Sequence, residues 1–274
     1  MVSQEQRRRQ LAREKFLRQQ QRRTSARRKA RMRNAAIASV LGVILIGSVA
    51  LYTTGVVLKD DDSKTNAGAE VSPSASAPSK APDPCDKPAD GKVKTQTWEK
   101  EPAMTIDKSA KYTMKLETTC GDIDIALKAE AAPHTVNSFD FLAGKGFFDH
   151  TKCHRLTTNG IFVLQCGDPT GQGNGGPGYN IPDENLKDKS LKDNMYPAGT
   201  VAMANTGQPN SGGSQFFLVY QNSPLPPSYT PFGTISDEGM TVLKKIAAAG
   251  ESTGAGDGAP NATVVIDKAT VAKS

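Results

Sequence analysis

The stretch CHRLTTNGIFVLQCGDPTGQGNGGPGY, residues 153–179, places three polar side chains in a segment that is otherwise mostly apolar or rich in glycine. They are His154, Arg155 and Gln165, and no metal-binding spacing or activated nucleophile accompanies them. The glycines lack the following lysine and helix of a phosphate-binding loop, so we interpret them as tight turns. The stretch therefore does not match a metal, nucleophilic or phosphate-binding site.

Alternating apolar residues around this stretch predict short β-strands. YTMKLET (112–118) and DIDIAL (122–127) each place every second apolar side chain on one face, with TCG as a turn between them. This pattern predicts a β-hairpin. Further strands are predicted at Ile161–Cys166, Thr200–Ala204, Gln215–Tyr220, Phe232–Ile235 and Ala262–Asp267.

Two stretches favour α-helices because their apolar residues recur at helical spacing. APHTVNSFDFLAGKG (132–146) has a proline suited to the first turn, and SDEGMTVLKKIAAAG (236–250) starts with Ser236 or Asp237 as a cap and stops at Gly250. Many strands with two separated helices indicate an all-β-dominated fold, a barrel plugged by helices.

Three motifs, in a fixed order, carry a resemblance to a known family. They are HRLTTNGIFVLQCGDPTGQGNGGPGY (154–179), GTVAMANTGQPNSGGSQFFLVY (199–220) and YTPFGTI (229–235). Together with the PHTVNSF helix, they resemble the cyclophilin-type peptidyl-prolyl cis-trans isomerases over residues 110–268. The resemblance implies a closed antiparallel eight-stranded β-barrel with two capping α-helices.

The resemblance also implies an isomerase (rotamase) that catalyses rotation of X-Pro peptide bonds. Rotation passes through a state without amide resonance, over a barrier of about 18–20 kcal/mol. A guanidinium that donates to the prolyl nitrogen stabilises this state, so the resemblance implies that Arg155 and Gln165 are catalytic. No bond is broken, and we expect no metal and no cofactor. The implied substrate-binding residues are His154, Phe162, Met203, Ala204, Asn205, Gln215, Phe217, Leu225 and Tyr229.

The sequence departs from the family pattern near the site. Six residues separate Arg155 from Phe162 where four are usual, which makes the loop 156–161 longer. We expect this loop to shift substrate preference without removing catalysis. The alternative is a membrane-tethered proline-binding module or chaperone with little turnover.

The first 57 residues predict a membrane anchor. Residues 35–57, AAIASVLGVILIGSVALYTTGVV, carry no charge and are long enough to span a core of about 30 Å. Basic residues precede this run and Asp60–Asp62 follow it, which predicts a cytoplasmic N-terminus and an extracytoplasmic catalytic domain. The layout resembles membrane-anchored members from high-GC Gram-positive bacteria. A cleaved secretory signal is the alternative, but both parts are long for one.

The charge is divided between the tail and the rest. The chain has 34 Lys and Arg, 28 Asp and Glu and a net charge of +6. Residues 1–34 hold 13 of the basic and two of the acidic residues, a net of +11, so the remainder has a net of −5. We interpret this basic cytoplasmic tail as a topology signal that also contacts anionic lipid. Recruitment of a cytoplasmic partner is the alternative, and we do not expect nucleic-acid binding.

The remaining regions follow from composition. Residues 58–105 include VSPSASAPSKAPDPCDKPADGK, which is rich in Pro, Ser and Ala and predicts a disordered linker. Residues 106–274 form the isomerase domain, which we expect to be monomeric and to assist folding of exported, proline-containing polypeptides.

The four cysteines, Cys85, Cys120, Cys153 and Cys166, would face an oxidising compartment and allow three complete pairings. If Arg155 and Gln165 share a face, alternation places the side chains of Cys153 and Cys166 on opposite faces. This argues against a direct bond between these two cysteines.

Overall fold

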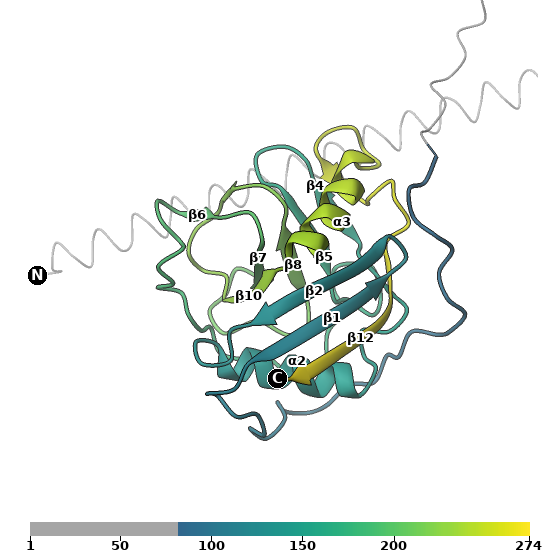
Figure 1. Cartoon of the computed structure of the whole chain (residues 1–274). Coiled ribbons are helices and arrows are strands. Elements are labelled where there is room, and N and C mark those ends of the chain that lie inside the picture. The colour runs from purple at the N-terminus through teal and green to yellow at the C-terminus, as the bar shows by residue number, and fades with distance from the viewer. Residues whose placement is uncertain (1–81) are drawn as a thin grey trace, which may run out of the picture. The chain divides into compact units, whose positions relative to one another are not determined.

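The computed structural model describes residues 82–274, which form a curled β-sheet with two α-helices (Figure 1). The predicted tail (1–34), the predicted anchor (35–57) and the linker as far as residue 81 lie outside the described residues. Within residues 82–274, no helix has the length and apolar character needed to cross a membrane. The elements are β1 (Tyr112–Thr118), β2 (Gly121–Leu127), α2 (Pro133–Gly144), β3 (Thr151–Lys152), β4 (Arg155–Thr157), β5 (Val163–Cys166), β6 (Met195–Tyr196), β7 (Thr200–Met203), β8 (Phe216–Val219), β9 (Ser223–Pro224), β10 (Pro231–Ile235), α3 (Asp237–Ala248), β11 (Asp257–Gly258) and β12 (Val265–Lys273).

The main sheet has ten antiparallel strands in the order β11-β4-β5-β8-β7-β10-β2-β1-β12-β3, and β6 pairs separately with β9. Only Cys153 and His154 separate β3 from β4 along the chain. The Cys153 N–H donates to the Val264 carbonyl and the His154 N–H donates to the Gln165 carbonyl, both at 3.0 Å. Residues 151–157 therefore bond to β12 on one side and β5 on the other, which curls the sheet. Ten strands replace the expected eight because this segment counts as two strands and because β11 adds a short strand beside β4.

The β1–β2 hairpin confirms the period-two prediction. Met114 pairs with Ile125 and Leu116 pairs with Ile123, and all four side chains are buried. Gly121 has a φ of 125°, which glycine adopts without strain, and a Cβ there would meet the Val242 side chain of α3 at 2.9 Å. The turn therefore depends on glycine for both its conformation and its packing.

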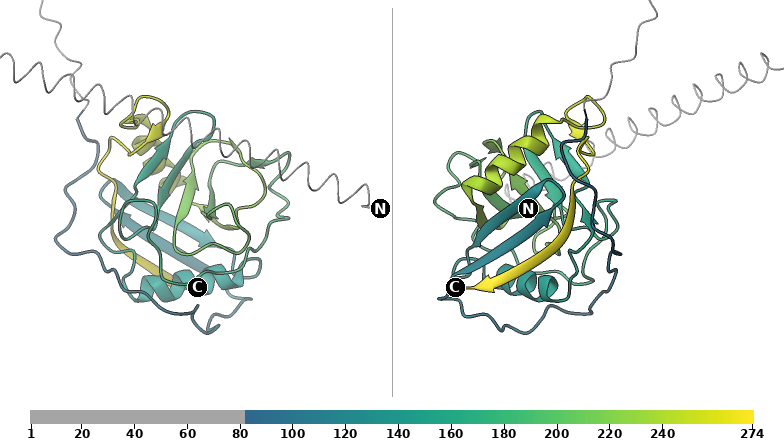
Figure 2. Two further views of the ribbon diagram at one scale, coloured as in Figure 1. Left: turned by 180° about the vertical axis from the view of Figure 1, so that it is seen from behind. Right: turned by 45° about the vertical axis from the view of Figure 1, so that its right-hand side comes forward.

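The two predicted helices are also confirmed, and they lie at opposite ends of the curled sheet (Figure 2). In α2, Val136, Phe139 and Leu142 are fully buried in the main core. In α3, the Ser236 hydroxyl accepts a hydrogen bond from the Gly239 N–H at 3.0 Å, which satisfies one of the free donors of the first turn.

Alternation along β8 separates an inner core from a smaller outer cluster. Phe216 and Leu218 belong to the main core, and the Phe216 ring packs edge-on against Phe139 with 5.5 Å between centroids. Phe217 and Val219 point the other way and join an outer apolar cluster. Period-two alternation along the strand therefore places Phe216 in the core and Phe217 on the outer face. The outer cluster forms the base of the candidate site.

Residues 82–110 run along the outside of the sheet (Figures 1 and 2). The Trp98 ring packs edge-on against Phe141 at 5.1 Å, and the Trp98 N–H donates to the Pro177 carbonyl at 2.8 Å. The expected linker reached residue 105, whereas the described segment contacts the domain from residue 83 onward, where the Asp83 carboxylate accepts from the Thr263 N–H. Specific contacts hold this segment, among them the Trp98 ring, the Asp83 carboxylate and backbone hydrogen bonds, and average composition does not predict such contacts.

Both cysteine pairs form disulfides. Cys85–Cys120 joins the N-terminal segment to the β1–β2 turn, and Cys153–Cys166 joins the break between β3 and β4 to the end of β5. The argument against the second pair was wrong. Cys153 lies in the two-residue break, where regular strand alternation is interrupted. The side chains of Cys153 and Cys166 therefore both reach the main core.

Candidate functional site

A cavity of about 110 Å³ opens on the outer face of β5 and β8. Its apolar wall includes Phe217, whose ring meets the Tyr229 ring edge-on with 5.4 Å between centroids. The Tyr196 hydroxyl donates to the Tyr229 carbonyl at 2.7 Å, and burial raises the pKa of Tyr196 to about 12. The cavity therefore offers a space for one small group beside a fixed apolar wall. Its lining residues are Arg155, Ile161, Val163, Gln165, Ala204, Asn205, Phe217, Leu225 and Tyr229.

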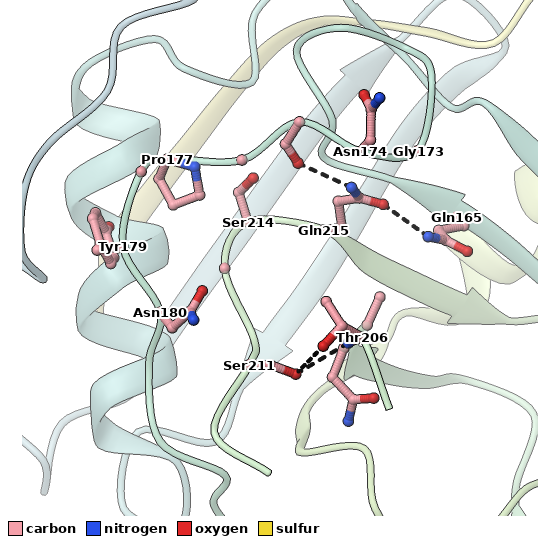
Figure 3. A pocket seen from close by; sticks show the side chains of 16 residues that line it. Gln165, Gly173, Asn174, Pro177, Tyr179, Asn180, Thr206, Ser211, Ser214 and Gln215 are labelled. Atoms are coloured by element: carbon pink, nitrogen blue, oxygen red, sulfur yellow. Dashed lines mark hydrogen bonds between the residues drawn. The ribbon is translucent and has the colours of Figure 1, made fainter. Parts of the chain in front are cut away.

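A chain of hydrogen bonds forms the polar edge of the cavity. The Asp257 carboxylate accepts from Arg155 Nε at 2.7 Å and from Nη2 at 2.8 Å. Arg155 Nη1 donates to Gln165 Oε1 at 3.2 Å, and Gln165 Nε2 donates to Gln215 Oε1 at 2.9 Å. Gln215 Nε2 then donates to the Gly175 carbonyl at 2.9 Å (Figure 3). These bonds fix the orientation of both Arg155 and Gln165.

Electrostatics keep the guanidinium charged. The hydrogen bond to Asp257 raises the pKa of Arg155 above its usual value, against the smaller effect of burial. The same bond lowers the pKa of Asp257, so that carboxylate is ionised at neutral pH. The site therefore presents a permanent hydrogen-bond donor beside an apolar wall and has no group suited to proton transfer at its centre.

A larger groove of about 420 Å³ adjoins the cavity and shares Gln165, Ala204 and Asn205 with it. The glycine-rich loop 173–178 forms one wall (Figure 3). The buried Asp168 carboxylate holds this loop, because it accepts from backbone N–H groups at Thr170 and Gly173 among others. Burial raises the pKa of Asp168, but these bonds outweigh it and the pKa is lowered.

The structure brings together seven of the eleven predicted site residues in the cavity: Arg155, Gln165, Ala204, Asn205, Phe217, Leu225 and Tyr229. Gln215 lies in the adjoining groove and bonds to Gln165. Met203 belongs to the inner core, because it alternates along β7 with Ala202 of the outer cluster. Phe162 is not among the lining residues and packs instead on Tyr220, with 5.9 Å between ring centroids.

His154 is also outside the cavity. Both of its ring nitrogens are buried and have no hydrogen-bond partner in the described part of the chain. Burial lowers the pKa of His154 below its ordinary value of 6.5; Asp168 partly opposes this and Arg155 adds to it. The His154 ring lies near Gly173 of the glycine-rich loop, and its predicted role in substrate binding stays a prediction.

This lowered pKa predicts a pH dependence of stability. An unfolded His154 takes up a proton near pH 6.5, whereas the folded one resists it, so its stabilising contribution is present above pH 6.5 and is lost as the pH falls through the folded pKa. We expect the melting temperature to decline between pH 7 and pH 5, and less steeply in His154→Gln. His134→Gln is the matched control for loss of an imidazole elsewhere. Equal slopes for wild type and His154→Gln would contradict the burial argument.

Three residues that the sequence did not single out contribute to the site. Ile161 and Val163 line the cavity, and they lie four and two positions before Gln165. Period-two spacing from Gln165 was the signal for both. Asp257 had no comparable signal, because it lies 102 residues from Arg155 in a glycine-rich loop.

Comparisons with known proteins agree with this geometry. The family model for cyclophilin type peptidyl-prolyl cis-trans isomerase/CLD matches residues 113–271. The probable peptidyl-prolyl cis-trans isomerase B of Mycobacterium leprae is 45% identical over 196 residues, covering 69% of this chain and 62% of the relative. Its Mycobacterium tuberculosis counterpart is 44% identical over 198 residues, covering 69% of this chain and 60% of the relative. The chain thus spans about three fifths of the length of these relatives.

Structural comparison gives the same result. A crystal structure of a cyclophilin-type peptidyl-prolyl cis-trans isomerase from Cryptosporidium parvum is similar with a TM-score of 0.50 and 26% identity, covering 60% of this chain and 99% of that chain. The sheet with its two helices corresponds to the fold that the three sequence motifs implied. The chain belongs to the cyclophilin-type peptidyl-prolyl cis-trans isomerase family.

Proposed function

We propose that this protein catalyses cis–trans interconversion of X-Pro peptide bonds, with the proline in the 110 Å³ cavity. One observation carries the proposal: the Arg155 guanidinium lies across the cavity from an apolar wall and is held there by Asp257 and Gln165. Phe217 and Leu225 provide the apolar wall for a pyrrolidine ring. Family membership supports the same reaction.

The chemistry follows from the electronic structure of the amide. In the planar ground state the prolyl nitrogen shares its lone pair with the carbonyl, whereas in the twisted transition state the lone pair is localised on nitrogen. A donor aimed at that nitrogen binds the transition state more strongly than either planar form, which lowers the barrier. Arg155 Nη1 is suited to this role, because Nε and Nη2 are occupied by Asp257.

The groove favours a polypeptide over free proline as the substrate. It shares Gln165, Ala204 and Asn205 with the cavity, so a chain whose proline occupies the cavity continues into the groove. The side-chain amide of Gln165 is fixed by Gln215 and faces both spaces, which suits it to hold a substrate carbonyl. Binding on both sides of the reacting bond restrains the substrate while that bond rotates.

We further propose that the domain is anchored in the membrane by residues 35–57 and assists folding of exported proteins on the outer face. Support comes from the charge difference across that apolar run. Two disulfides in the domain are also typical of an oxidising compartment. Labelling of exposed lysines in the domain by a membrane-impermeant, amine-reactive reagent in intact cells tests this placement. Labelling only after lysis of the cells would contradict it.

One observation favours the alternative of a proline-binding module with little turnover: the charge of Arg155 is matched by Asp257. The deciding experiment follows the relaxation of a cis-enriched X-Pro peptide with and without the purified protein. We expect acceleration in proportion to protein concentration, and no binding of the matched X-Ala peptide. Binding of the X-Pro peptide without acceleration would establish the binding module instead.

A further inference from the structure

Asp257 lies on β11, which pairs with β4 so that Asp257 is opposite Thr157. Arg155 lies two residues before Thr157 on β4. The Asp257 carboxylate reaches Arg155 and accepts hydrogen bonds from its Nε and Nη2. A two-point contact of this kind fixes the plane of a guanidinium as well as its position. Nη1 is on the side of the guanidinium that faces Gln165 and the cavity.

The loop that carries Asp257 is itself held from within. The Glu251 side chain is nearly buried and accepts from the Gly256 N–H at 2.8 Å and from the Thr253 hydroxyl at 2.7 Å. The Thr253 hydroxyl also donates to the Asp257 carbonyl at 3.2 Å. Gly256 has a φ of 92°, which favours glycine at this position. Asp257 is therefore presented by an ordered turn.

The longer loop 156–161 packs against the turn that carries Asp257. The Thr158 N–H donates to the Gly256 carbonyl at 2.9 Å, and a Cβ on Gly256 would clash with Asn159. Thr158 and Asn159 of this longer loop thus pack directly against the turn that presents Asp257. This gives the departure from the family pattern a specific structural role beside the cavity.

We propose that Asp257 is a positioning residue that orients Arg155 for isomerisation; the inference rests on the proposed function. The Arg155 and Asp257 side chains are 38% and 56% exposed, and exposed ion pairs contribute little to folding stability. The carboxylate has two opposing effects on the reaction, because it aligns the guanidinium and also offsets its charge. Alignment dominates, since a donor must be directed at the prolyl nitrogen to act.

The experiment compares Asp257→Asn with Asp122→Asn. Asp122 is a matched control, because it is 54% exposed and pairs with Lys115 at the same 2.7 Å, but lies on β2. For Asp257→Asn we expect kcat to fall about tenfold, below the ~10²-fold that a misplacement of 1 Å produces, with KM nearly unchanged. Asp257→Glu keeps the carboxylate and is expected to recover part of the loss. Asp122→Asn is expected to match wild type.

A second readout reports the contact directly. The NMR signal of the Arg155 Nε–H should exchange slowly with water in wild type and in Asp122→Asn, and rapidly in Asp257→Asn. A wild-type kcat in Asp257→Asn would overturn the positioning role of Asp257 but leave the proposed function intact. A raised kcat in this variant would also overturn that role, because the effect of Asp257 on the charge of Arg155 would then outweigh its effect on alignment. An inactive wild type would overturn the proposed function and this inference together, even if the Nε–H signal were protected.

Discussion

Arg155→Ala is expected to lower kcat/KM for X-Pro isomerisation by about 10²- to 10³-fold, the range found when one preorganised transition-state donor is removed. The Nη1 group is the donor at the cavity edge, and alanine leaves the apolar wall of Phe217 and Leu225 in place. Peptide affinity should therefore remain close to wild type while turnover is lost. Relaxation kinetics and a binding titration with the same peptide measure the two quantities separately.

Arg155→Lys is the control for charge. Lysine keeps the positive charge but presents no planar fork to the Asp257 carboxylate and has no fixed donor direction. We expect an activity between those of wild type and Arg155→Ala. If lysine restored full activity, charge alone would account for catalysis and the hydrogen-bond geometry would be irrelevant.

Phe139→Ala is expected to reduce the free energy of unfolding by about 3–5 kcal/mol, as is usual for deletion of a buried phenyl ring. Phe139 is fully buried in α2 and its ring contacts Phe148, Phe216 and Phe232, with centroids 4.6 to 5.5 Å apart. Because a domain of this size has only about 5–15 kcal/mol in total, a large share of its stability would be lost. Denaturant unfolding measures the change.

Phe141→Ala is the matched control in the same helix. Phe141 is only partly buried and packs on Trp98 at the edge of the main core. We expect a loss well below that of Phe139→Ala, since fewer contacts are removed. Equal losses for the two variants would mean that the ring cluster around Phe139 is not the centre of the core.

Local patterns allowed most of the fold to be predicted. The hairpin partners Leu116 and Ile123 lie within a few residues of each other, and their alternation directly reports which face is buried. Likewise, Phe139 and Leu142 mark the buried side of a helix through their spacing alone. The apolar run at 35–57 remains a prediction, as do the tail and the linker up to residue 81.

Alternation failed where a strand is interrupted, and it succeeded along β5 and the residues before it. Cys153 lies in a two-residue break, so counting from Arg155 gave the wrong face. Conversely, counting back from Gln165 in steps of two places Val163 and Ile161 on the cavity side, where both line the cavity. The substrate-binding role that the resemblance implies for Phe162 stays a prediction. The ladder of hydrogen bonds, and not the spacing alone, decides which face a side chain occupies.

The contact between Asp257 and Arg155 could not be predicted from a sequence pattern. The loop GESTGAGDG reads only as a series of turns, and nothing in it points to an arginine 102 residues earlier. The contact arises because β11 pairs with β4. Only two residues of each strand take part, and such a short strand has no periodic pattern that would predict it. Short, long-range pairings of this kind are visible only once the chain is folded.

Exchange NMR on an X-Pro peptide with a small amount of the wild-type protein tests the central claim most directly. Without a catalyst, the cis and trans forms interconvert in tens to hundreds of seconds, so no exchange peaks arise within a mixing time of about one second. We predict that the protein produces cis–trans exchange peaks on that timescale. Shifted or broadened peptide signals without exchange peaks would contradict the account, because the cavity would then bind proline without catalysing rotation.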